Sequence, residues 1–458
     1  MTQILFDAEL IARYDRPGPR YTSYPTAPQF QSDFTEAELR RELRASNDGN
    51  RPLSLYVHIP FCEHLCFYCA CTKIVTRHRE WGGPYVDRVE QEMLLWRRDL
   101  DASRPVVQLH LGGGTPSFLL RADLERLLDA FHRHFHLLDD DRGEYGIEID
   151  PRALEPGTLS LLRQAGWNRL SMGVQDLDEA VQKAVHREQT LERTAEIIAE
   201  ARSLGFASIS LDLIYGLPLQ SPQSFSQTLA AIIALRPDRL SLFNYAHLPE
   251  RFPPQRRIRT DDLPSPAQKL IILQESIAAL AAAGYRYIGM DHFALPEDEL
   301  SLAQDRGDLY RNFQGYSTHA SADLVAMGMS AISSVGRVYS QNHKELGTWE
   351  KAVDAGHLAV ERGLLLTEDD LLRRELITRI ICDFRLDIPT LEQRFGIEFW
   401  HYFAESRPRL EELERDGLIA WQEKELLVTE RGRLLVRHVC MAFDAYLGQS
   451  KTTFSRII

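Results

Sequence analysis

The sequence predicts an α/β fold in which parallel strands form a barrel or part of one, with an N-terminal extension and a mostly helical C-terminal domain. Three observations lead to this prediction. Six short, β-rich, apolar segments alternate with helical segments, an alternation typical of βα units in a parallel sheet. Six such units within about 200 residues favour a barrel, complete or partial, over a small open sheet. From about residue 360 the pattern changes to helices.

The strand segments are largely apolar and rich in β-branched residues. They are expected at 53–59, 106–111, 145–149, 169–174, 208–214 and 239–245. Helices with apolar residues at helical spacing are expected between them, at 85–100, 124–135, 191–205 and 224–235. We expect a further helix at 266–283 and an apolar segment at 285–290 to extend the series.

The C-terminal part has a different pattern of predicted secondary structure. Helices are predicted at 366–384, 388–396 and 402–417, a small hairpin at 418–422 and 425–429, and a closing helix at 431–447. A hairpin followed by a helix resembles a winged-helix pattern, but no basic, aromatic-rich patch accompanies it, so we expect a packing domain rather than a DNA-binding one. The predicted division is 1–50, an extension and candidate lid; 51–300, the barrel core; 301–360, a connecting segment near the substrate site; and 361–458, the helical domain.

Composition and charge restrict the classes of function. Hydrophobic residues make up 44% and charged residues 26% of the chain, which fits a globular protein and excludes a disordered one. The net charge of −13 repels nucleic acid and anionic membranes, so neither is an expected partner. No apolar run reaches the roughly 20 residues of a membrane helix. The N-terminus lacks the basic start and apolar middle of a signal peptide, so we expect a cytoplasmic protein.

Four of the six cysteines lie within ten residues, directly after the first predicted strand. They are Cys62, Cys66, Cys69 and Cys71, while Cys382 and Cys440 stand alone. The loop at the carboxyl end of a barrel strand is where chemistry gathers in such folds. Three thiolates spaced as in CxxxCxxC can each hold one corner of an iron–sulfur cube. The fourth iron is then open to a substrate or cofactor, as in catalytic metal sites.

A structural zinc site is the alternative interpretation of the same cysteines, with His58, His64 or His78 as further ligands. Zinc sites usually take their ligands as two short pairs separated by a longer spacer. Cys69 and Cys71 are one residue apart, which is a poor spacing for two ligands of one tetrahedron. The pattern therefore favours the cluster over zinc.

Polar residues or glycines lie at the end of every predicted strand. After the cysteine loop, these are Gly112, Gly113 and Gly114, then Glu148, Gln175 and Asp212, and finally Tyr245 with Ala246. A single polar strand end is usually a cap or a turn residue, and glycines often make a tight turn. Because the carboxyl ends of parallel strands share one rim, six in sequence predict a bowl-shaped site.

The motifs resemble those of a known superfamily. CxxxCxxC with Tyr68 beside its last cysteine, GGGTP and EIDP are similar to the signature of the radical SAM superfamily. A narrower resemblance is to the oxygen-independent coproporphyrinogen III dehydrogenase family. It rests on YVHIPFCEHLCFYCAC with Cys71, GPRYTSYPT, SMGVQD, HREQ, DLIYGLP, YAHLP and NFQGYSTH. It extends from the N-terminal lead-in, which is the expected extension at 1–50, to about residue 345 and more weakly beyond. The cysteine at 71 distinguishes this family from its haem-chaperone relatives.

The resemblance implies a partial, three-quarter (β/α)6 radical SAM barrel with two kinds of cofactor. Cys62, Cys66 and Cys69 would bind a [4Fe-4S] cluster whose open iron chelates S-adenosylmethionine. Tyr56, Gly113, Glu148 and Ile332 would line that first molecule. A second S-adenosylmethionine would contact Tyr68, Gly114, Thr115, Gln175, Arg187, Asp212 and Ala246. Cys71 is a candidate catalytic residue to which the resemblance assigns no role.

The implied activity is the anaerobic conversion of coproporphyrinogen III to protoporphyrinogen IX in haem biosynthesis. A 5′-deoxyadenosyl radical would abstract a propionate β-hydrogen, and two propionates would become vinyl groups with loss of two CO2. A reducing donor such as flavodoxin or ferredoxin and a monomeric state are implied as well. Arg16, Arg20, Arg77 and Arg79 are candidates for binding substrate carboxylates. The alternatives are a haem-binding chaperone on the same scaffold and another tetrapyrrole-modifying radical SAM enzyme.

Overall fold

The computed structural model describes residues 4–448 and divides into two compact units. We call the first the sheet unit; it comprises Phe30–Ser265 and Ser321–Leu365. The second, the terminal unit, comprises Met1–Gln29, Pro266–Ala320 and Leu366–Ile458. Residues 1–3 of the expected extension and 449–458 of the expected helical domain lie outside the described residues.

Six parallel strands form the centre of the sheet unit, as the sequence predicted. They are β1 (Leu53–Ile59), β4 (Pro105–Gly113), β6 (Glu144–Ile149), β7 (Arg169–Gln175), β8 (Ser208–Tyr215) and β9 (Arg239–Asn244). Their spatial order is β9-β8-β7-β6-β4-β1, and every neighbouring pair is parallel. The carboxyl ends of all six strands therefore point the same way, and the predicted α/β class is confirmed.

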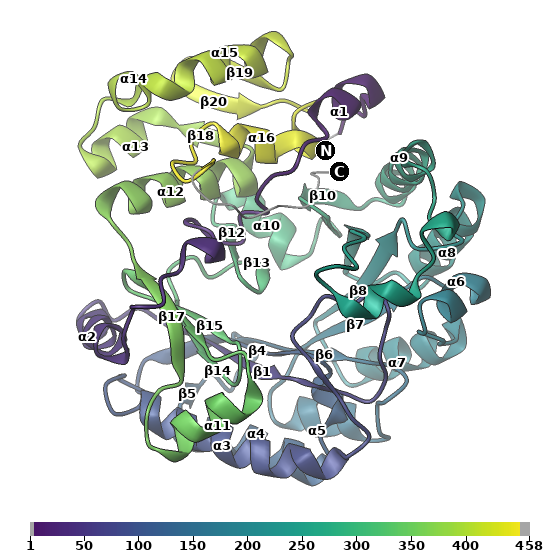
Figure 1. Ribbon diagram of the computed structural model, residues 1–458, viewed down its shortest axis with the longest axis vertical. Helices are drawn as coiled ribbons and strands as arrows, with labels where there is room; N and C mark the ends of the chain where they lie inside the picture. The colour runs from purple at the N-terminus through teal and green to yellow at the C-terminus, as the bar shows by residue number, and fades with distance from the viewer. Residues whose placement is uncertain (1–3, 449–458) are drawn as a thin grey trace. The chain divides into compact units, whose positions relative to one another are not determined.

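Helices follow the strands and lie outside them in the sheet unit, as Figure 1 shows. They are α3 (Gly82–Trp96), α4 (Arg121–His134), α5 (Thr158–Gln164), α6 (Glu179–Ala184), α7 (Leu191–Ser203) and α8 (Pro222–Ala234). Three of them, α6, α7 and α8, begin with a capping side chain. The Thr190 side chain caps α7, and Ser221 with Ser224 forms a capping box at α8, which satisfies backbone N–H groups that have no partner within the helix.

The alternation of side chains along β7 shows how the strands separate core from cavity. Leu170, Met172 and Val174 are buried, whereas Ser171 and Gln175 are half-buried and line a cavity. Successive side chains of a strand point to opposite faces. One face of β7 therefore joins the apolar core and the other presents small and polar groups to the cavity.

Four further strands complete the sheet unit. Three lie where the sequence analysis expected only a connecting segment, and the fourth, β17, lies mostly in the region expected to begin the helical domain. β14 (Asp323–Met327) pairs in parallel with β1, and β15 (Ile332–Val335), β16 (Val338–Asn342) and β17 (Val360–Leu365) continue the sheet as antiparallel strands. The pattern gave no signal for β16, because this strand buries the polar residues Ser340, Gln341 and Asn342. Its sequence therefore lacks the apolar pattern that predicts a strand.

Smaller elements join these strands. They are α2 (Glu36–Asn47), α11 (Leu346–Asp354), β2 (Phe61–Cys62), β3 (Ile74–Val75), β5 (His136–Leu137) and the 3-10 helices η1 (Ala27–Gln29), η2 (Arg79–Trp81), η3 (Pro116–Phe118), η4 (Pro253–Arg257) and η5 (Thr260–Asp262). Of these, η1 belongs to the terminal unit. β5 pairs with β4, and α11 packs against α3.

A buried carboxyl group ties α3 to the added strands. Glu92 is fully buried and accepts hydrogen bonds from the Gly328 N–H (2.8 Å), Asn342 Nδ2 (2.7 Å) and Trp349 Nε1 (3.2 Å). Burial raises the pKa of Glu92 to about 7, although the three donors oppose the shift. An ionised carboxylate is costly in an apolar interior even when it is hydrogen-bonded.

Glu92 is expected to make the stability of the fold depend on pH. Because its pKa is higher in the folded than in the unfolded chain, its contribution is complete below about pH 4.5 and declines as the pH rises through about 7, by up to about 3 kcal/mol. Glu92→Gln cannot ionise. The unfolding free energy of this variant relative to the parent should therefore rise between about pH 5 and pH 8. Thermal unfolding at both pH values measures it, with the exposed Glu125→Gln as control; a pH-independent difference would contradict the assignment.

The terminal unit is mostly helical, as predicted for the C-terminal domain. Its elements are α1 (Ala8–Tyr14), α9 (Pro266–Ala282), β10 (Arg286–Gly289), β11 (His292–Ala294), α10 (Glu299–Arg306), β12 (Tyr310–Asn312), β13 (Gly315–Ser317), α12 (Glu368–Asp383), β18 (Arg385–Asp387), α13 (Ile388–Phe395), α14 (Phe399–Tyr402), η6 (Ala404–Ser406), α15 (Arg407–Arg415), β19 (Ile419–Gln422), β20 (Glu425–Val428), η7 (Arg433–Leu435) and α16 (Val436–Met441). The predicted hairpin is β19 with β20, and β18 adds a third strand that the analysis missed.

The closing helix is shorter than predicted. A helix was expected over 431–447, but α16 ends at Met441. Beyond it, the Tyr21 hydroxyl donates to the Asp444 carboxylate (2.9 Å), and the Ala445 N–H donates to the Tyr24 hydroxyl (2.9 Å). These hydrogen bonds to the lead-in stabilise residues 444–445 in a non-helical conformation. The lead-in is thus held within the terminal unit, and its role as a lid stays a prediction.

Candidate functional site

The cysteine loop follows β1 and is held closed at its base. β2 and β3 form a short parallel ladder, with Ile74 N–H donating to the Pro60 carbonyl (2.7 Å) and Thr76 N–H to the Cys62 carbonyl (2.9 Å). At the tip, the Phe67 N–H donates to the Val185 carbonyl (3.0 Å). The loop conformation is therefore set by backbone bonds on both sides of the cysteines.

A cavity of about 160 Å³ brings most of the predicted site residues together. Its lining includes Cys62, Cys66, Tyr68, Cys69, Cys71, Gly113, Gly114, Thr115, Glu148, Gln175, Arg187 and Asp212. The other three predicted residues, Tyr56, Ala246 and Ile332, do not line it. Tyr56 lies on β1 and stacks on His110 (6.1 Å between ring centroids), and Ile332 is half-buried on β15. The bowl predicted from the strand ends thus has a structural counterpart.

The thiols in this cavity differ in their surroundings. Burial raises the pKa of Cys62 to about 11, although the Thr115 hydroxyl lies 3.4 Å from its sulfur. The hydrogen bond from the Cys71 thiol lowers the pKa of Cys69, and nearby Lys73 adds to the effect. Cys71 itself is exposed. The thiolate is the form that binds metals, and Cys69 is therefore more readily ionised for this role than Cys62.

Two arginines lie beside the third predicted ligand, Cys66. Arg152 Nη2 and Arg187 Nη1 each lie 3.6 Å from its sulfur. Asp150 accepts from Arg152 (2.6 Å) and from Arg187 (3.4 Å), and these cations outweigh burial and hold the pKa of Asp150 down at about 2. The sequence analysis assigned no role to Asp150 or Arg152. Their position two and four residues after Glu148, in the same strand-end motif, was the available signal.

The glycines after β4 make room for the protein's own groups. Gly113 has a φ of +117°, and a Cβ there would lie 2.6 Å from the His58 ring. A Cβ at Gly112 would lie 2.9 Å from Glu148 Oε1. The Gly113 N–H and His110 Nε2 contact the Glu148 carboxylate at 3.1 and 3.2 Å. Burial opposes ionisation, but these contacts lower the pKa of Glu148 below its ordinary value.

Three further residues of the cavity lining, Asp212, Arg187 and Gln175, have polar groups in positions to contact a ligand. Burial raises the pKa of Asp212 to about 6, against a hydrogen bond from Ser241. Within residues 4–448, buried polar atoms without a hydrogen-bond partner include Arg187 Nε and Gln175 Oε1, both in residues of the cavity lining. Buried polar groups in folded proteins are normally satisfied. These two atoms are therefore suited to hydrogen-bond a polar ligand in the cavity.

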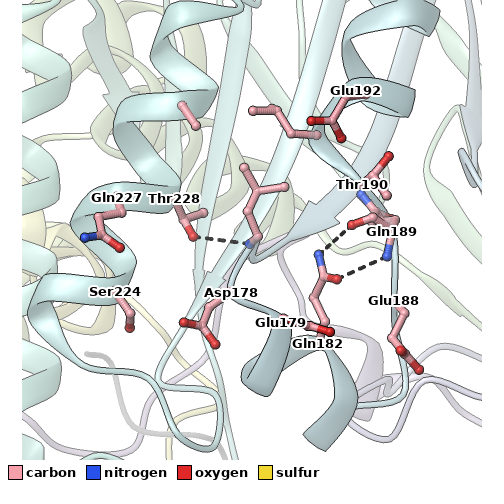
Figure 2. Close-up of a pocket in the computed structure, with 13 residues that line it drawn as sticks. Asp178, Glu179, Gln182, Glu188, Gln189, Thr190, Glu192, Ser224, Gln227 and Thr228 are labelled. Atoms are coloured by element: carbon pink, nitrogen blue, oxygen red, sulfur yellow. Dashed lines mark hydrogen bonds between the residues drawn. The ribbon is translucent and has the colours of Figure 1, made fainter.

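A second cavity is lined in part by Glu188, Gln189 and Thr190, which follow Arg187 in the same loop. It has a volume of about 590 Å³ and lies between α6, α7 and α8 (Figure 2). At its edge the Gln182 side chain brackets the backbone of Gln189, donating to its carbonyl (2.8 Å) and accepting from its N–H (3.2 Å). Three of the acids around this cavity belong to helix starts, since Asp178 caps α6, Glu179 lies in its first turn and Glu192 lies in the first turn of α7. These contacts support the loop that presents Arg187.

The comparisons with known proteins agree with this geometry. Residues 56–232 match the Radical SAM superfamily, and residues 366–435 match the HemN C-terminal domain. Curated proteins named oxygen-independent coproporphyrinogen III oxidase are 54% identical in Pseudomonas aeruginosa (99% of both chains) and 50% identical in Escherichia coli (100% of this chain, 99% of the relative). The chain belongs to the oxygen-independent coproporphyrinogen III oxidase family. The resemblance seen in the motifs is thereby confirmed.

A solved structure from the same family supports the fold over almost the whole chain. It is the coproporphyrinogen III oxidase of Escherichia coli, described as a radical SAM enzyme, with a TM-score of 0.92 at 50% identity and coverage of 97% of this chain and 100% of that chain. Across residues 4–448, no helix is long and apolar enough to cross a bilayer.

Membership of the Radical SAM superfamily implies a [4Fe-4S] cluster and S-adenosylmethionine as cofactors. The residues fit these groups: the cavity holds three thiols at the family spacing and two unsatisfied polar atoms on its wall. In the described part of the chain, no three His, Cys, Asp or Glu side chains gather as ligands of a single ion. A cube does not require that, because its cysteines bind different irons.

The four arginines predicted to bind substrate carboxylates differ in their contacts and exposure. Arg79 is held by Glu155 and by the carbonyls of Phe118 (2.8 Å) and Leu119 (2.9 Å), contacts that give it a structural role. Arg16 and Arg77 are exposed. Arg20 is an ion-pair partner of Asp291 (3.1 Å).

Gln255 is a residue that sequence reasoning missed. It is 1% exposed, and its Nε2 donates to the carbonyls of Tyr68 (3.1 Å) and Ala246 (3.2 Å), while its Oε1 accepts from the Leu248 N–H (2.6 Å). It thus joins the cysteine loop to the loop after β9. No motif signals this role, because it depends on the packing of a proline-rich loop far along the chain.

Replacing Gln255 is expected to weaken S-adenosylmethionine binding while the cluster is retained. Gln255→Glu keeps the acceptor for Leu248 but loses both donors to the loop carbonyls. Two lost hydrogen bonds of about 1 kcal/mol each predict a rise in KM for S-adenosylmethionine of up to about thirty-fold, with a smaller change in kcat. Steady-state kinetics and iron analysis measure both. The exposed Gln227→Glu on α8 is the control, and an unchanged KM would refute the positioning role.

Proposed function

We propose that this protein converts coproporphyrinogen III to protoporphyrinogen IX without oxygen, as an enzyme of haem biosynthesis. The observation that carries the proposal is that three thiols of one loop share a cavity with the unsatisfied polar atoms of Arg187 and Gln175. The family supports the choice of substrate, since its curated relatives are named for oxidising coproporphyrinogen III.

In this proposal Cys62, Cys66 and Cys69 hold the cluster. The Cys71 thiol donates a hydrogen bond to Cys69 and so favours its thiolate. Arg152 and Arg187 place positive charge against the sulfur of Cys66. Positive charge and hydrogen bonds at a ligand sulfur stabilise the reduced state of an iron–sulfur cluster.

The other cavity residues are assigned to the nucleotide cofactor. Tyr56, Gly113, Glu148 and Ile332 would line a first S-adenosylmethionine, with Glu148 held ionised by His110 and the Gly113 N–H. Tyr68, Gly114, Thr115, Gln175, Arg187, Asp212 and Ala246 would contact a second molecule. The link through Gln255 between the carbonyls of Tyr68 and Ala246 supports a shared role for these two residues.

When bound, the cluster and S-adenosylmethionine would supply a one-electron cleavage of the sulfonium. The radical chemistry that follows would remove one hydrogen atom from a substrate propionate. Each propionate then loses CO2 and one further electron and becomes a vinyl group, so an electron acceptor is required. The protein's part is to orient the reactants and exclude water. We further propose a reducing donor such as flavodoxin or ferredoxin, a monomer, a cytoplasmic location and no nucleic-acid or membrane partner, in keeping with the net charge of −13.

Anaerobic turnover tests the proposal. The reconstituted protein, S-adenosylmethionine and coproporphyrinogen III, with a strong reductant to start each cleavage and a one-electron acceptor to take up the electron released, should yield protoporphyrinogen IX, CO2 and 5′-deoxyadenosine. Omission of S-adenosylmethionine is the control. Stable haem binding without any vinyl product would favour a chaperone instead, and turnover of a different tetrapyrrole alone would indicate another radical SAM enzyme.

A further inference from the structure

The sulfur of Cys66 has a more positive environment than the sulfur of Cys62. Two guanidinium groups contact it, since Arg152 Nη2 and Arg187 Nη1 each lie 3.6 Å from this sulfur. At Cys62 the contact is neutral, from the Thr115 hydroxyl at 3.4 Å. All of these residues belong to the sheet unit. Two formal positive charges therefore lie against one proposed ligand of the cluster.

A carboxylate fixes the position of the Arg152 side chain. Arg152 Nε lies 3.0 and 3.2 Å from the two carboxylate oxygens of Asp150, and Nη2 lies 2.6 Å from Oδ2. The Asp150 N–H in turn donates to Ser117 Oγ (3.3 Å). The side chains of Arg152 and Asp150 are 14% and 10% exposed. A guanidinium fork engaged in this way keeps its charge in one place.

The two arginines share this carboxylate but differ in their other contacts. Arg187 Nη1 lies 3.4 Å from Asp150, so one carboxylate faces two guanidinium groups. Arg187 also donates to the Gly173 carbonyl (2.6 Å), and in the described part of the chain its buried Nε has no hydrogen-bond partner. Arg187 thus keeps a donor for the nucleotide, whereas the Nε and Nη2 of Arg152 are engaged by Asp150 and Cys66.

Charge at a ligand sulfur affects how readily a cluster is reduced. Reduction adds one electron from the reducing donor and makes or breaks no bond, so the negative charge beside these arginines increases by one. Net charge and hydrogen bonds to the sulfurs are among the factors that set the reduction potential of an iron–sulfur cluster. A fixed guanidinium at the Cys66 sulfur is therefore expected to favour the reduced state.

We propose that Arg152, anchored by Asp150, raises the reduction potential of the cluster through the sulfur of Cys66. Arg152 is then a positioning residue rather than a catalytic one, because it acts through a cluster ligand, and contact with the nucleotide is left to Arg187. The inference rests on the proposed function only in that it requires the cluster. The identity of the tetrapyrrole does not enter it.

A redox titration of the cluster in the reconstituted whole chain tests this role. Electron paramagnetic resonance measures the reduced fraction at each potential, without S-adenosylmethionine or tetrapyrrole. At a fixed potential, Arg152→Gln should lower the ratio of reduced to oxidised cluster about ten-fold, the size expected for one hydrogen bond between charged groups. For one electron this is a shift of about 59 mV to lower potential. Arg152→Lys should shift less, because it keeps the charge but not the fork.

Arg193→Gln is the matched control. Arg193 donates to the carbonyls of Pro151 (3.4 Å) and Leu154 (3.3 Å) and to Glu196 (3.2 Å), so it supports the turn that carries Arg152. Its replacement removes one positive charge from the same turn, and the potential should stay that of the parent. An equal shift in Arg193→Gln would show that the potential follows the turn or the overall charge, and would overturn the inference.

The remaining outcomes also decide the role of Arg152. A complete cluster with the parent's potential in Arg152→Gln would overturn the inference. If that variant does not retain iron and sulfide, the potential of Arg152→Lys decides in its place: a value below the parent's supports the inference and an equal value overturns it. Loss of the cluster from both variants would assign Arg152 to cluster retention and overturn it as well.

Two further measurements separate this inference from its neighbours. Equilibrium dialysis of S-adenosylmethionine should give the parent's affinity in Arg152→Gln; a weaker affinity with an unshifted potential would place Arg152 in the nucleotide site and overturn the inference. Turnover of coproporphyrinogen III by the parent tests the proposed reaction. A potential that depends on Arg152 without turnover would defeat the reaction and keep the inference, and turnover with an unshifted potential would do the reverse.

Discussion

Replacing Cys69 by serine is expected to abolish the iron–sulfur cluster and, with it, all turnover. The Cys71 thiol and Lys73 lower the pKa of Cys69, so this residue presents the thiolate that a cluster iron requires. A serine hydroxyl at the same place does not ionise in this range. The remaining thiols, Cys62 and Cys66, would hold only two corners of the cube. About four irons and four sulfides per chain should fall to near zero after anaerobic reconstitution.

Iron and sulfide analysis with electron paramagnetic resonance of the reduced protein measures this result. Cys382→Ala is the control, because Cys382 is buried outside the cavity lining and its loss should leave the cluster intact. Cys71→Ser should also retain the cluster, since Cys71 is not proposed as a ligand. A complete cluster in Cys69→Ser, or none in Cys71→Ser, would show that the ligand set has been assigned wrongly.

Removing the carboxylate of Asp323 is expected to destabilise the sheet unit by about 3–5 kcal/mol, the usual cost of leaving a buried charge without its partner. Asp323 begins β14 beside β1 and is 0% exposed; its partner Arg104 is 1% exposed. Arg104 also donates to Ser46 Oγ (3.1 Å), and Asp323 Oδ1 accepts from the Gly336 N–H (3.1 Å). Asp323→Ala therefore leaves the Arg104 guanidinium buried and uncompensated.

Thermal or urea unfolding under anaerobic conditions measures the loss. The double variant Arg104→Met/Asp323→Leu should lose less than the sum of the two single changes, because it removes both charges together. Glu179→Ala, which breaks the exposed pair with Lys183 (side chains 80% and 57% exposed), is the control and should leave the stability nearly unchanged. A similar small cost for Asp323→Ala would contradict the importance of the buried pair.

Local patterns in the chain predicted the elements that are regular and amphipathic. The six parallel strands and the helices at 121–134, 191–203, 222–234 and 266–282 lie close to their predicted places, because apolar periodicity reflects burial on one face. β14 to β17 were not predicted. In β16 the buried residues are polar and are satisfied by neighbours, as Asn342 is by Glu92, and no local pattern records such a partner.

The candidate site divides in the same way. The cysteine spacing and the strand-end residues were readable because ligand chemistry and strand order impose them over short distances. Asp150, Arg152 and Gln255 were missed, because their roles depend on contacts between segments far apart in the chain.

The sequence by itself determined the parallel α/β core, the cysteine motif and the family. Only the tertiary structure decided which charges face the thiols and which glutamine joins the two loops of the rim. The physical reason is that local propensity and periodicity act over a few residues, whereas electrostatic and hydrogen-bond partners are chosen by the packed fold.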